Sequence, residues 1–324
     1  MKYISAFTCA LALFSNLGFG IVVQYQVVDA GLTGTAIREI REGKLAGFRY
    51  ENSFLGTRNF EEGFVKNIST GVPSLYKYPN AYSTQIYAIS TTDNNQYGGM
   101  AYFGELFPVR VYGFTKESNG NVNIIEPLGA SNSSVEGIYG ITSVGWYEQG
   151  ASRYSFLRVE SDSVSSFLRV AYNNPLQGYA SSTELRGIWG GVAVGSATFG
   201  GRSYGFGMSN SEFSGIYSAP GGSSGTYFND YNDGLIAGTA TFNGVNKPFL
   251  FNPSTEVWEF FVSPEGYSAS GSSYDNGILA GSYVTTSGET LGYYAYVPEP
   301  NIGRLVVLAL AMYTLFSRKR ENCN

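Results

Sequence analysis

The sequence GIYGITSVG at Gly137–Gly145 returns fifty residues later as GIWGGVAVG at Gly187–Gly195. A second pair, DGLIAG at Asp233–Gly238 and NGILAG at Asn276–Gly281, has the same form. Weaker copies end at Gly47 and Gly99, and the final glycines of successive copies lie 43 to 52 residues apart. A fixed period of this length indicates one structural unit repeated along the chain.

Each copy continues in register with an aromatic residue. Phe156, Phe206 and Phe249 follow their glycines by eleven residues, and Tyr293 follows by twelve; Phe64 and Phe114 follow by seventeen and fifteen. The residues between alternate in polarity and then turn, as at Asn243–Gly244, which predicts a β-hairpin in each unit. A proline closes five of the units, at 79, 127, 175, 220 and 264, with spacings of 44 to 48 residues.

The repeats predict an all-β domain over residues 21–296. Six units of about 45 residues, each supplying three or four short strands, correspond to a six-bladed β-propeller. The sixth unit stops before an outer strand, while Ile21–Asp29 reads as an unpaired strand at the other end of the chain. We expect that segment to complete the last blade and close the ring. Another all-β repeat form, such as an open solenoid, is the alternative.

Composition excludes several classes of chemistry. The chain has no histidine, and its two cysteines, Cys9 and Cys323, lie at its extreme ends. These facts exclude Ser-His-Asp and Cys-His catalysis and His-ligated metals, but not chemistry based on carboxylates, tyrosine, lysine or Ca²⁺. The net charge is −5, with no basic stripe, so nucleic acid is not an expected partner. No catalytic, cofactor-binding or metal-binding residue is assigned.

Residues 1–20 have the layout of a secretory signal peptide. Lys2 precedes a largely apolar run from Tyr3 to Phe14, and small residues follow up to Gly20. This order predicts export and cleavage by signal peptidase near Gly20.

Residues 297–324 have three parts in a fixed order. Val297-Pro298-Glu299-Pro300 comes first, an apolar run over Leu305–Phe316 follows, and the basic cluster Arg318-Lys319-Arg320 ends the segment. The apolar run predicts a short transmembrane helix whose basic end stays cytoplasmic.

This tail resembles the PEP-CTERM sorting domain, with Arg304 departing from the usual pattern. The resemblance implies processing by the membrane protease-transpeptidase exosortase in Gram-negative bacteria that make extracellular polysaccharide. It further implies a precursor anchored in the inner membrane and a final place at the cell surface or in the extracellular matrix. The units between Gly43 and Val297 also resemble the extracellular HAF repeats, although the histidine of that motif is absent. That family has no established catalytic activity.

Several residues are candidates for chemistry. Glu61, Glu62, Asp162 and Glu184 could serve glycoside cleavage, which needs two carboxyls at a set separation, but we interpret them as solvated loop residues. The segments 230–234 and 274–277 hint at Ca²⁺ but are better explained as Asn/Asp-Gly turns. Trp146, Trp189 and Trp258 suit sugar faces, although packing in the core is the first explanation. The repeated glycines are interpreted as close packing rather than a phosphate loop.

Two functions follow. The first is a non-catalytic, surface-sorted repeat protein that binds extracellular polysaccharide or another matrix component. The alternative is a secreted carbohydrate-active hydrolase or lyase that uses carboxylates or tyrosine. Two or three carboxylates with an arginine at the central channel would favour the alternative.

Overall fold

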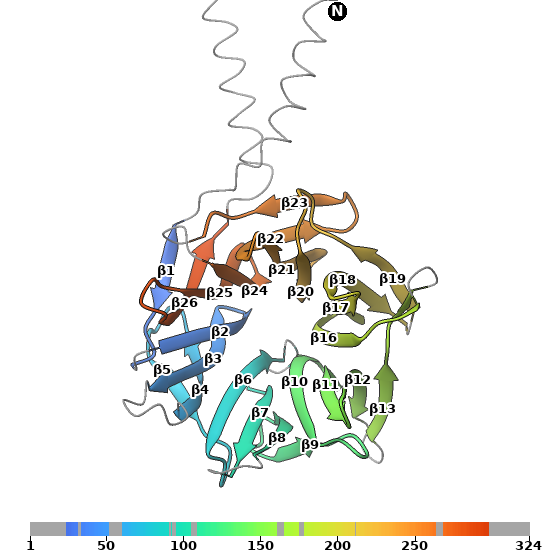
Figure 1. The fold of residues 1–324 in the computed structure, drawn as a ribbon. Helices are drawn as coiled ribbons and strands as arrows, with labels where there is room; N and C mark the ends of the chain where they lie inside the picture. Colours follow the sequence, from blue (N-terminus) through green and yellow to red (C-terminus); the bar gives the residue numbers. More distant parts are fainter. Residues whose placement is uncertain are drawn as a thin grey trace, which may run out of the picture.

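The computed structural model describes residues 24–31, 34–51, 60–90, 92, 95–104, 109–160, 165–174, 178–210, 212–263 and 268–297. These residues form β-strands and no helix, and the sheets surround a central axis in a β-propeller arrangement (Figure 1). The predicted all-β fold is therefore confirmed. The predicted signal peptide and C-terminal helix fall outside the described residues. Within the described part, no helix has the length and apolar character needed to cross a bilayer.

Four sheets have four strands each and stand apart from one another. The first contains β2 (Gly34–Arg41), β3 (Lys44–Glu51), β4 (Phe60–Asn67) and β5 (Pro73–Tyr76). The second contains β6 (Ser83–Ile89), β7 (Tyr97–Phe103), β8 (Arg110–Lys116) and β9 (Val122–Ile125). The third contains β10 (Asn132–Tyr139), β11 (Thr142–Gln149), β12 (Ser152–Glu160) and β13 (Ser165–Val170). The fourth contains β24 (Ala269–Asp275), β25 (Ile278–Val284), β26 (Thr290–Tyr296) and β1 (Tyr25–Val28).

The remaining long strands belong to one eight-stranded sheet. It contains β16 (Ser182–Trp189), β17 (Val192–Phe199), β18 (Arg202–Ser209), β19 (Glu212–Tyr217), β20 (Gly225–Asn232), β21 (Leu235–Phe242), β22 (Val245–Asn252) and β23 (Val257–Phe260). A small ribbon of β14 (Asn173–Asn174) and β15 (Gly178–Tyr179) precedes it.

The prediction of a six-bladed β-propeller is wrong, because the long strands form four four-stranded sheets and one eight-stranded sheet. The fourth and fifth repeat units share a sheet because Ser203 on β18 pairs in parallel with Gly225 on β20. Missing side chains permit this approach: a Cβ at Gly205 would lie 2.5 Å from the ring of Phe228 in the next unit. The sequence repeat shows where units begin, but not that two of them join through one residue pair.

The N-terminal strand closes the last sheet, as predicted. β1 runs antiparallel to β26, from the Tyr25–Ala295 pair to the Val28–Gly292 pair. Val28 is buried, and the ring of Tyr25 meets that of Tyr293 edge-on at 4.8 Å. The two ends of the domain therefore complete one sheet (Figure 1).

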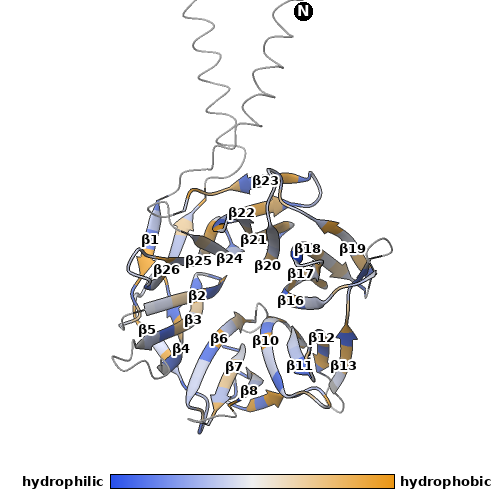
Figure 2. Ribbon diagram, in the orientation of Figure 1, coloured by the Kyte–Doolittle hydropathy of each residue, from blue (hydrophilic) through white to orange (hydrophobic). Residues whose placement is uncertain are grey.

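The repeated aromatic residues form the centre of each unit. Phe64, Phe114, Phe156, Phe206, Phe249 and Tyr293 are all fully buried, and each pairs across strands with the repeated glycine of its unit. At Gly238, for example, the Phe249 ring occupies the space where a side chain would stand. Hydrophobic and hydrophilic residues alternate along many strands around this centre (Figure 2). The glycines serve packing, as predicted.

Candidate functional site

The strand nearest the axis in each repeat unit contains one β-bulge. The register shifts once in each of β2, β6, β10, β16, β20 and β24, and the extra residues are Arg38, Tyr87, Glu136, Arg186, Asn229 and Ser272. A bulge re-aims the side chain of its extra residue. All six extra residues line one cavity of about 240 Å³, which we call the bulge cavity. Each repeat unit thus contributes one different side chain to a shared site.

The repeated glycines explain these bulges. Gly195 pairs with Leu185, the residue just before the bulged Arg186, and a Cβ at Gly195 would lie 1.9 Å from the Glu184 carbonyl oxygen. The equivalent separations at Gly47, Gly99, Gly145, Gly238 and Gly281 are 2.0, 2.0, 2.0, 2.3 and 1.9 Å. Any side chain there would collide with the backbone of the inner strand. The glycine motif that reveals the repeat therefore also shapes the cavity.

Hydroxyl, amide and aromatic groups complete the cavity wall. Tyr227, Thr239, Asn246 and Ser270 join the six bulged residues. The bottom narrows to a space of about 10 Å³, where Glu39 and Asp230 are added to the lining. The wall thus offers many hydrogen-bonding groups and few apolar ones.

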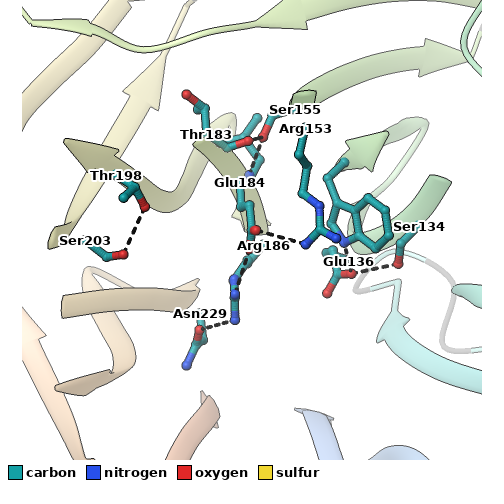
Figure 3. A network of polar contacts seen from close by, with 12 residues as sticks. Ser134, Glu136, Arg153, Ser155, Thr183, Glu184, Arg186, Thr198, Ser203 and Asn229 are labelled. Carbon is teal, nitrogen blue, oxygen red and sulfur yellow. Dashed lines mark hydrogen bonds and ion pairs between the residues drawn. The ribbon is translucent and has the colours of Figure 1, made fainter. Parts of the chain in front are cut away.

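An ion-pair chain holds Arg186 in place (Figure 3). Its guanidinium lies 2.7 Å from Glu184 and donates to Asn229 at 3.2 Å, while Glu184 also meets Arg153 at 3.1 Å. Burial raises the pKa of Glu184, but the charges of Arg186 and Arg153 outweigh burial and hold that pKa below its usual value. The charge of Arg186 is therefore already compensated within the protein.

Glu136 is the one carboxylate among the described residues that line the bulge cavity. It accepts hydrogen bonds from the Ser134 hydroxyl at 2.6 Å and from the Trp146 indole at 2.8 Å (Figure 3). No ion pair joins it to an arginine or lysine of the described residues. Its hydrogen bonds come from neutral donors, while the charge of Arg186 acts on it from across the cavity.

Arg38 is exposed in the same cavity. Its guanidinium lies over the Tyr87 ring, 4.8 Å from the centroid, and 5.5 Å from the centroid of Phe48. It forms neither a hydrogen bond nor an ion pair with any described residue. Tyr87 beneath it is buried, which raises the pKa of its phenol well above the usual value. The rings hold a positive charge whose donors remain available.

The other end of the inner strands carries a second cavity, of about 340 Å³, which we call the turn cavity. Trp189, Asp233, Tyr274 and the hairpin turn at Asn276 are part of its wall. At its base Arg41, which is 2% exposed, lies 2.5 Å from Asp230 and 2.9 Å from Glu39. The arginine at this end is buried and paired, while Glu42 and Asp233 of the same wall are exposed.

The candidates named from the sequence lie elsewhere than expected. Glu61 and Glu62 are on β4 and Glu184 is on β16, so the interpretation as loop residues is wrong for all three; Asp162 lies outside the described residues. Glu61 accepts hydrogen bonds from Gln85 and Ser83, and Glu62 pairs with Arg49 at 2.6 Å. Their partners give these side chains structural roles on strands.

Trp258 packs among aromatic rings and the two turns form, both as predicted, whereas Trp189 is also part of the turn-cavity wall. Trp258 stacks on Phe251 at 4.1 Å, and Trp189 meets Tyr139 of the preceding unit at 5.3 Å. Trp146 differs, because it donates to Glu136 at the bulge cavity. Asp233-Gly234 and Asn276-Gly277 form turns with positive φ angles.

Sequence reasoning missed the bulged residues. The signal was present: in five units the bulged residue stands nine positions before the repeated glycine, and in the second unit Tyr87 stands twelve before Gly99.

Of the proposed sorting motif, only Val297 is described; it is buried, and its N–H donates to the Gly277 carbonyl at 2.8 Å. The rest of the motif and the basic cluster lie outside the described residues.

No family model and no curated protein matches this chain. Among solved structures, Trypanosoma rangeli sialidase matches over 90% of this chain and 58% of its own, with 9% identity and a TM-score of 0.50. The acylaminoacyl peptidase of Pyrococcus horikoshii matches over 83% and 53%, with 8% identity and a TM-score of 0.49. The β-propeller domain of the Trilobed protease from Pyrococcus furiosus matches over 81% and 93%, with 8% identity and a TM-score of 0.48.

The chain therefore spans little more than half of the sialidase and of the acylaminoacyl peptidase. Identities this low bear on the fold alone. What is shown is that this chain folds as a β-propeller, with a fold similar to that of Trypanosoma rangeli sialidase.

Proposed function

We propose that the protein is exported, sorted to the cell surface, and binds extracellular polysaccharide or a related matrix component in the bulge cavity without cleaving it. The observation that carries the proposal is the convergence of six bulged side chains, one from each repeat unit, on one polar cavity. Binding sites are concave, with a few convergent polar groups that fix the ligand.

The chemistry of the wall favours a sugar. Sugar rings combine many hydroxyl groups with apolar C–H faces, and tyrosines and amides match both. Tyr227, Asn229, Thr239 and Ser270 supply these groups in the bulge cavity. Rigid strands, rather than loops, position them, so the site is formed before the ligand arrives.

A binding role is favoured over cleavage by the placement of the carboxylates. Glycoside cleavage generally needs two carboxyl groups on opposite sides of the bond. Within the described residues the bulge cavity proper has one, Glu136, whereas at its narrow end Asp230 pairs with Arg41 and Glu39 contacts the same arginine. Histidine, the commonest acid-base group, is missing from the sequence.

Sorting to the surface is proposed from the two ends of the sequence. We expect signal peptidase to cut near Gly20 and exosortase to act at the Pro298-Glu299-Pro300 segment. Intact-mass measurement on protein from the native cells tests both cuts. Mature protein that still carries Arg318-Lys319-Arg320 would rule out the exosortase step.

The binding proposal is tested on a glycan array with the purified full chain, beside a polysaccharide-degradation assay. Tyr227→Ala should weaken binding to any glycan bound by about tenfold, the effect of losing an aromatic contact and a hydrogen bond. Tyr179→Ala is the matched control, because Tyr179 is 76% exposed and lines none of the cavities described above. Equal binding by both variants would contradict the cavity as the site.

A carbohydrate-cleaving enzyme is the second candidate. The observation that favours it is Glu136, a carboxylate in the cavity with Tyr87 and two arginines around it. Polysaccharide cleavage that Glu136→Gln abolishes would establish this alternative. Binding without release of products would support the first candidate.

A further inference from the structure

We propose that the bulge cavity selects a saccharide unit that carries a carboxylate, with Arg38 as the residue that binds the anion. This inference rests on the proposed function and specifies its ligand: an acidic polysaccharide built from uronic acid units. Two observations carry it: Arg38 forms no hydrogen bond or ion pair with any described residue, and it lies in the cavity wall.

Arg38 differs from most arginines of the described residues. Arg41, Arg49, Arg153, Arg158 and Arg186 each form an ion pair with a carboxylate. Arg110 and Arg202 donate hydrogen bonds to Tyr112 and Ser218. Among the described arginines, one whose N–H donors are used by no described residue is therefore unusual.

Arg169 resembles Arg38 but has no cavity. Arg169 is on the outer strand β13, and its guanidinium lies 3.6 Å from the centroid of the Tyr154 ring of β12. No described carboxylate pairs with it. The difference is the location, because Arg38 alone of the two lines the bulge cavity. Arg169 thus provides an internal control for the effect of location.

The rings beneath Arg38 prepare it for a planar anion. Cation–π attraction to the Tyr87 and Phe48 rings holds the guanidinium beside them without using its N–H donors. A guanidinium edge matches the two oxygens of a carboxylate with parallel hydrogen bonds. Little side-chain entropy would be lost on binding, since the rings already restrict the side chain.

Glu136 narrows the ligand class further. Arg38 and Glu136 line one cavity without forming an ion pair with each other, so the site presents an anion receptor and a separate acceptor. A uronic acid unit supplies both complements, a carboxylate for Arg38 and hydroxyl donors for Glu136. A sulfate or phosphate group without hydroxyls would use only the first.

The overall acidity of the chain does not oppose this assignment at short range. The net charge is −5, but charges beyond roughly 8 Å are screened at physiological salt. The charges next to the ligand decide its affinity: Arg38 attracts the carboxylate, and Glu136 in the same cavity requires that the hydroxyl groups of the sugar, not its carboxylate, face it. Binding to the acidic ligand should weaken as salt rises.

The test uses the purified full chain and oligomers of galacturonate, glucuronate and mannuronate, each as the free acid and as the methyl ester. The ester keeps the ring and removes the charge. We expect at least about tenfold tighter binding of one free acid than of its ester, as for a charge-assisted bidentate contact. Arg38→Gln should bring the acid down to the ester, and Arg169→Gln should leave the ratio unchanged.

The outcomes separate the two proposals. Equal binding of acid and ester, or binding only of neutral glycans, overturns the acidic ligand and leaves saccharide binding standing. Binding of no glycan in either form overturns both. Thermal melting of Arg38→Gln must match the native protein, which we expect because the side chain pairs with no described residue; a large drop would show that Arg38 is structural and contradict the assignment.

Discussion

Two arginines on one strand behave in opposite ways. Arg41 lies at the turn cavity, buried and paired with Asp230 and Glu39, whereas Arg38, three residues earlier on β2, faces the bulge cavity with no ion partner among the described residues. A buried charge must be paired because its desolvation is costly. An exposed charge stays hydrated without a protein partner and can bind a ligand. On this strand, therefore, the paired arginine has a structural role, and the arginine without an ion partner is the one that lines the proposed site.

Because β1 completes the last sheet, removing it should destabilise the whole domain, including both cavities. We expect this deletion to cause the largest loss of stability of the changes considered. Deleting residues 24–30 exposes the edge of β26 and removes the buried side chain of Val28 and the half-buried ring of Tyr25. These two side chains alone contribute roughly 2–4 kcal/mol. Chemical denaturation measures the loss. Truncation after Val297, which removes no described strand, is the control, and an unchanged midpoint in the deletion would contradict closure by β1.

The paired end should be intolerant of substitution. Asp230→Ala leaves Arg41 buried without its 2.5 Å partner and removes an acceptor for Ser273. Breaking a buried ion pair in this way costs about 3–5 kcal/mol. Urea unfolding measures it. A loss below about 1 kcal/mol would mean that the pair does not hold this end together.

The bulge of β16 can be tested by substituting the repeated glycine that faces it, Gly195. Gly195→Ala places a methyl group 1.9 Å from the Glu184 carbonyl and should shift the inner strand with Arg186. We expect a loss of about 1–3 kcal/mol in stability, as for overpacking, together with weaker ligand binding. Gly215→Ala is the matched control, because nothing lies within 4 Å of its added Cβ. Equal losses of stability and binding in the two variants would contradict the role of the repeated glycine in shaping the bulge cavity.

The turn-cavity end should also sense pH. Burial raises the pKa of Glu39 to about 8, with Asp230 adding to the rise and Arg41 opposing it. Because the folded pKa lies above the ordinary 4.5, the folded state holds a proton that the unfolded state releases. The stability from this group is complete below about 4.5 and is lost as pH rises to about 8.

Melting temperatures at pH 6 and pH 9 measure this effect, and we expect a lower value at pH 9. The loss should be smaller than that of Asp230→Ala, because Arg41 keeps its main partner. Glu39→Gln, which is neutral at both values, should reduce the difference. If the melting temperatures of the native protein and of Glu39→Gln change equally with pH, a group other than Glu39 takes up the proton.

Arg38→Gln should have the smallest effect on stability, within about 0.5 kcal/mol, as for other exposed positions without partners. Differential scanning calorimetry of the native and variant chains measures it. A large loss of stability would show that Arg38, like Arg41, has a structural role, and would contradict the contrast between the two arginines.

The repeat glycines and aromatics were enough to predict the all-β units, because strand pairing places Gly195 beside the buried Phe206 in a way that the spacing reveals. The closing strand was predictable because one end lacked a strand and the other had one to spare. The joining of two units through Ser203 and Gly225 was not, since one residue pair leaves no periodic signal. The bulge cavity was missed because the bulged residues share a position but no residue type.

The most direct test of the account is a crystal structure of the full chain with the best-bound oligosaccharide. The account predicts the sugar in the bulge cavity, its carboxylate within hydrogen-bonding distance of the Arg38 guanidinium and its hydroxyls at Glu136 and Asn229. A sugar in the turn cavity or on the outer strands, with the bulge cavity empty, would contradict it.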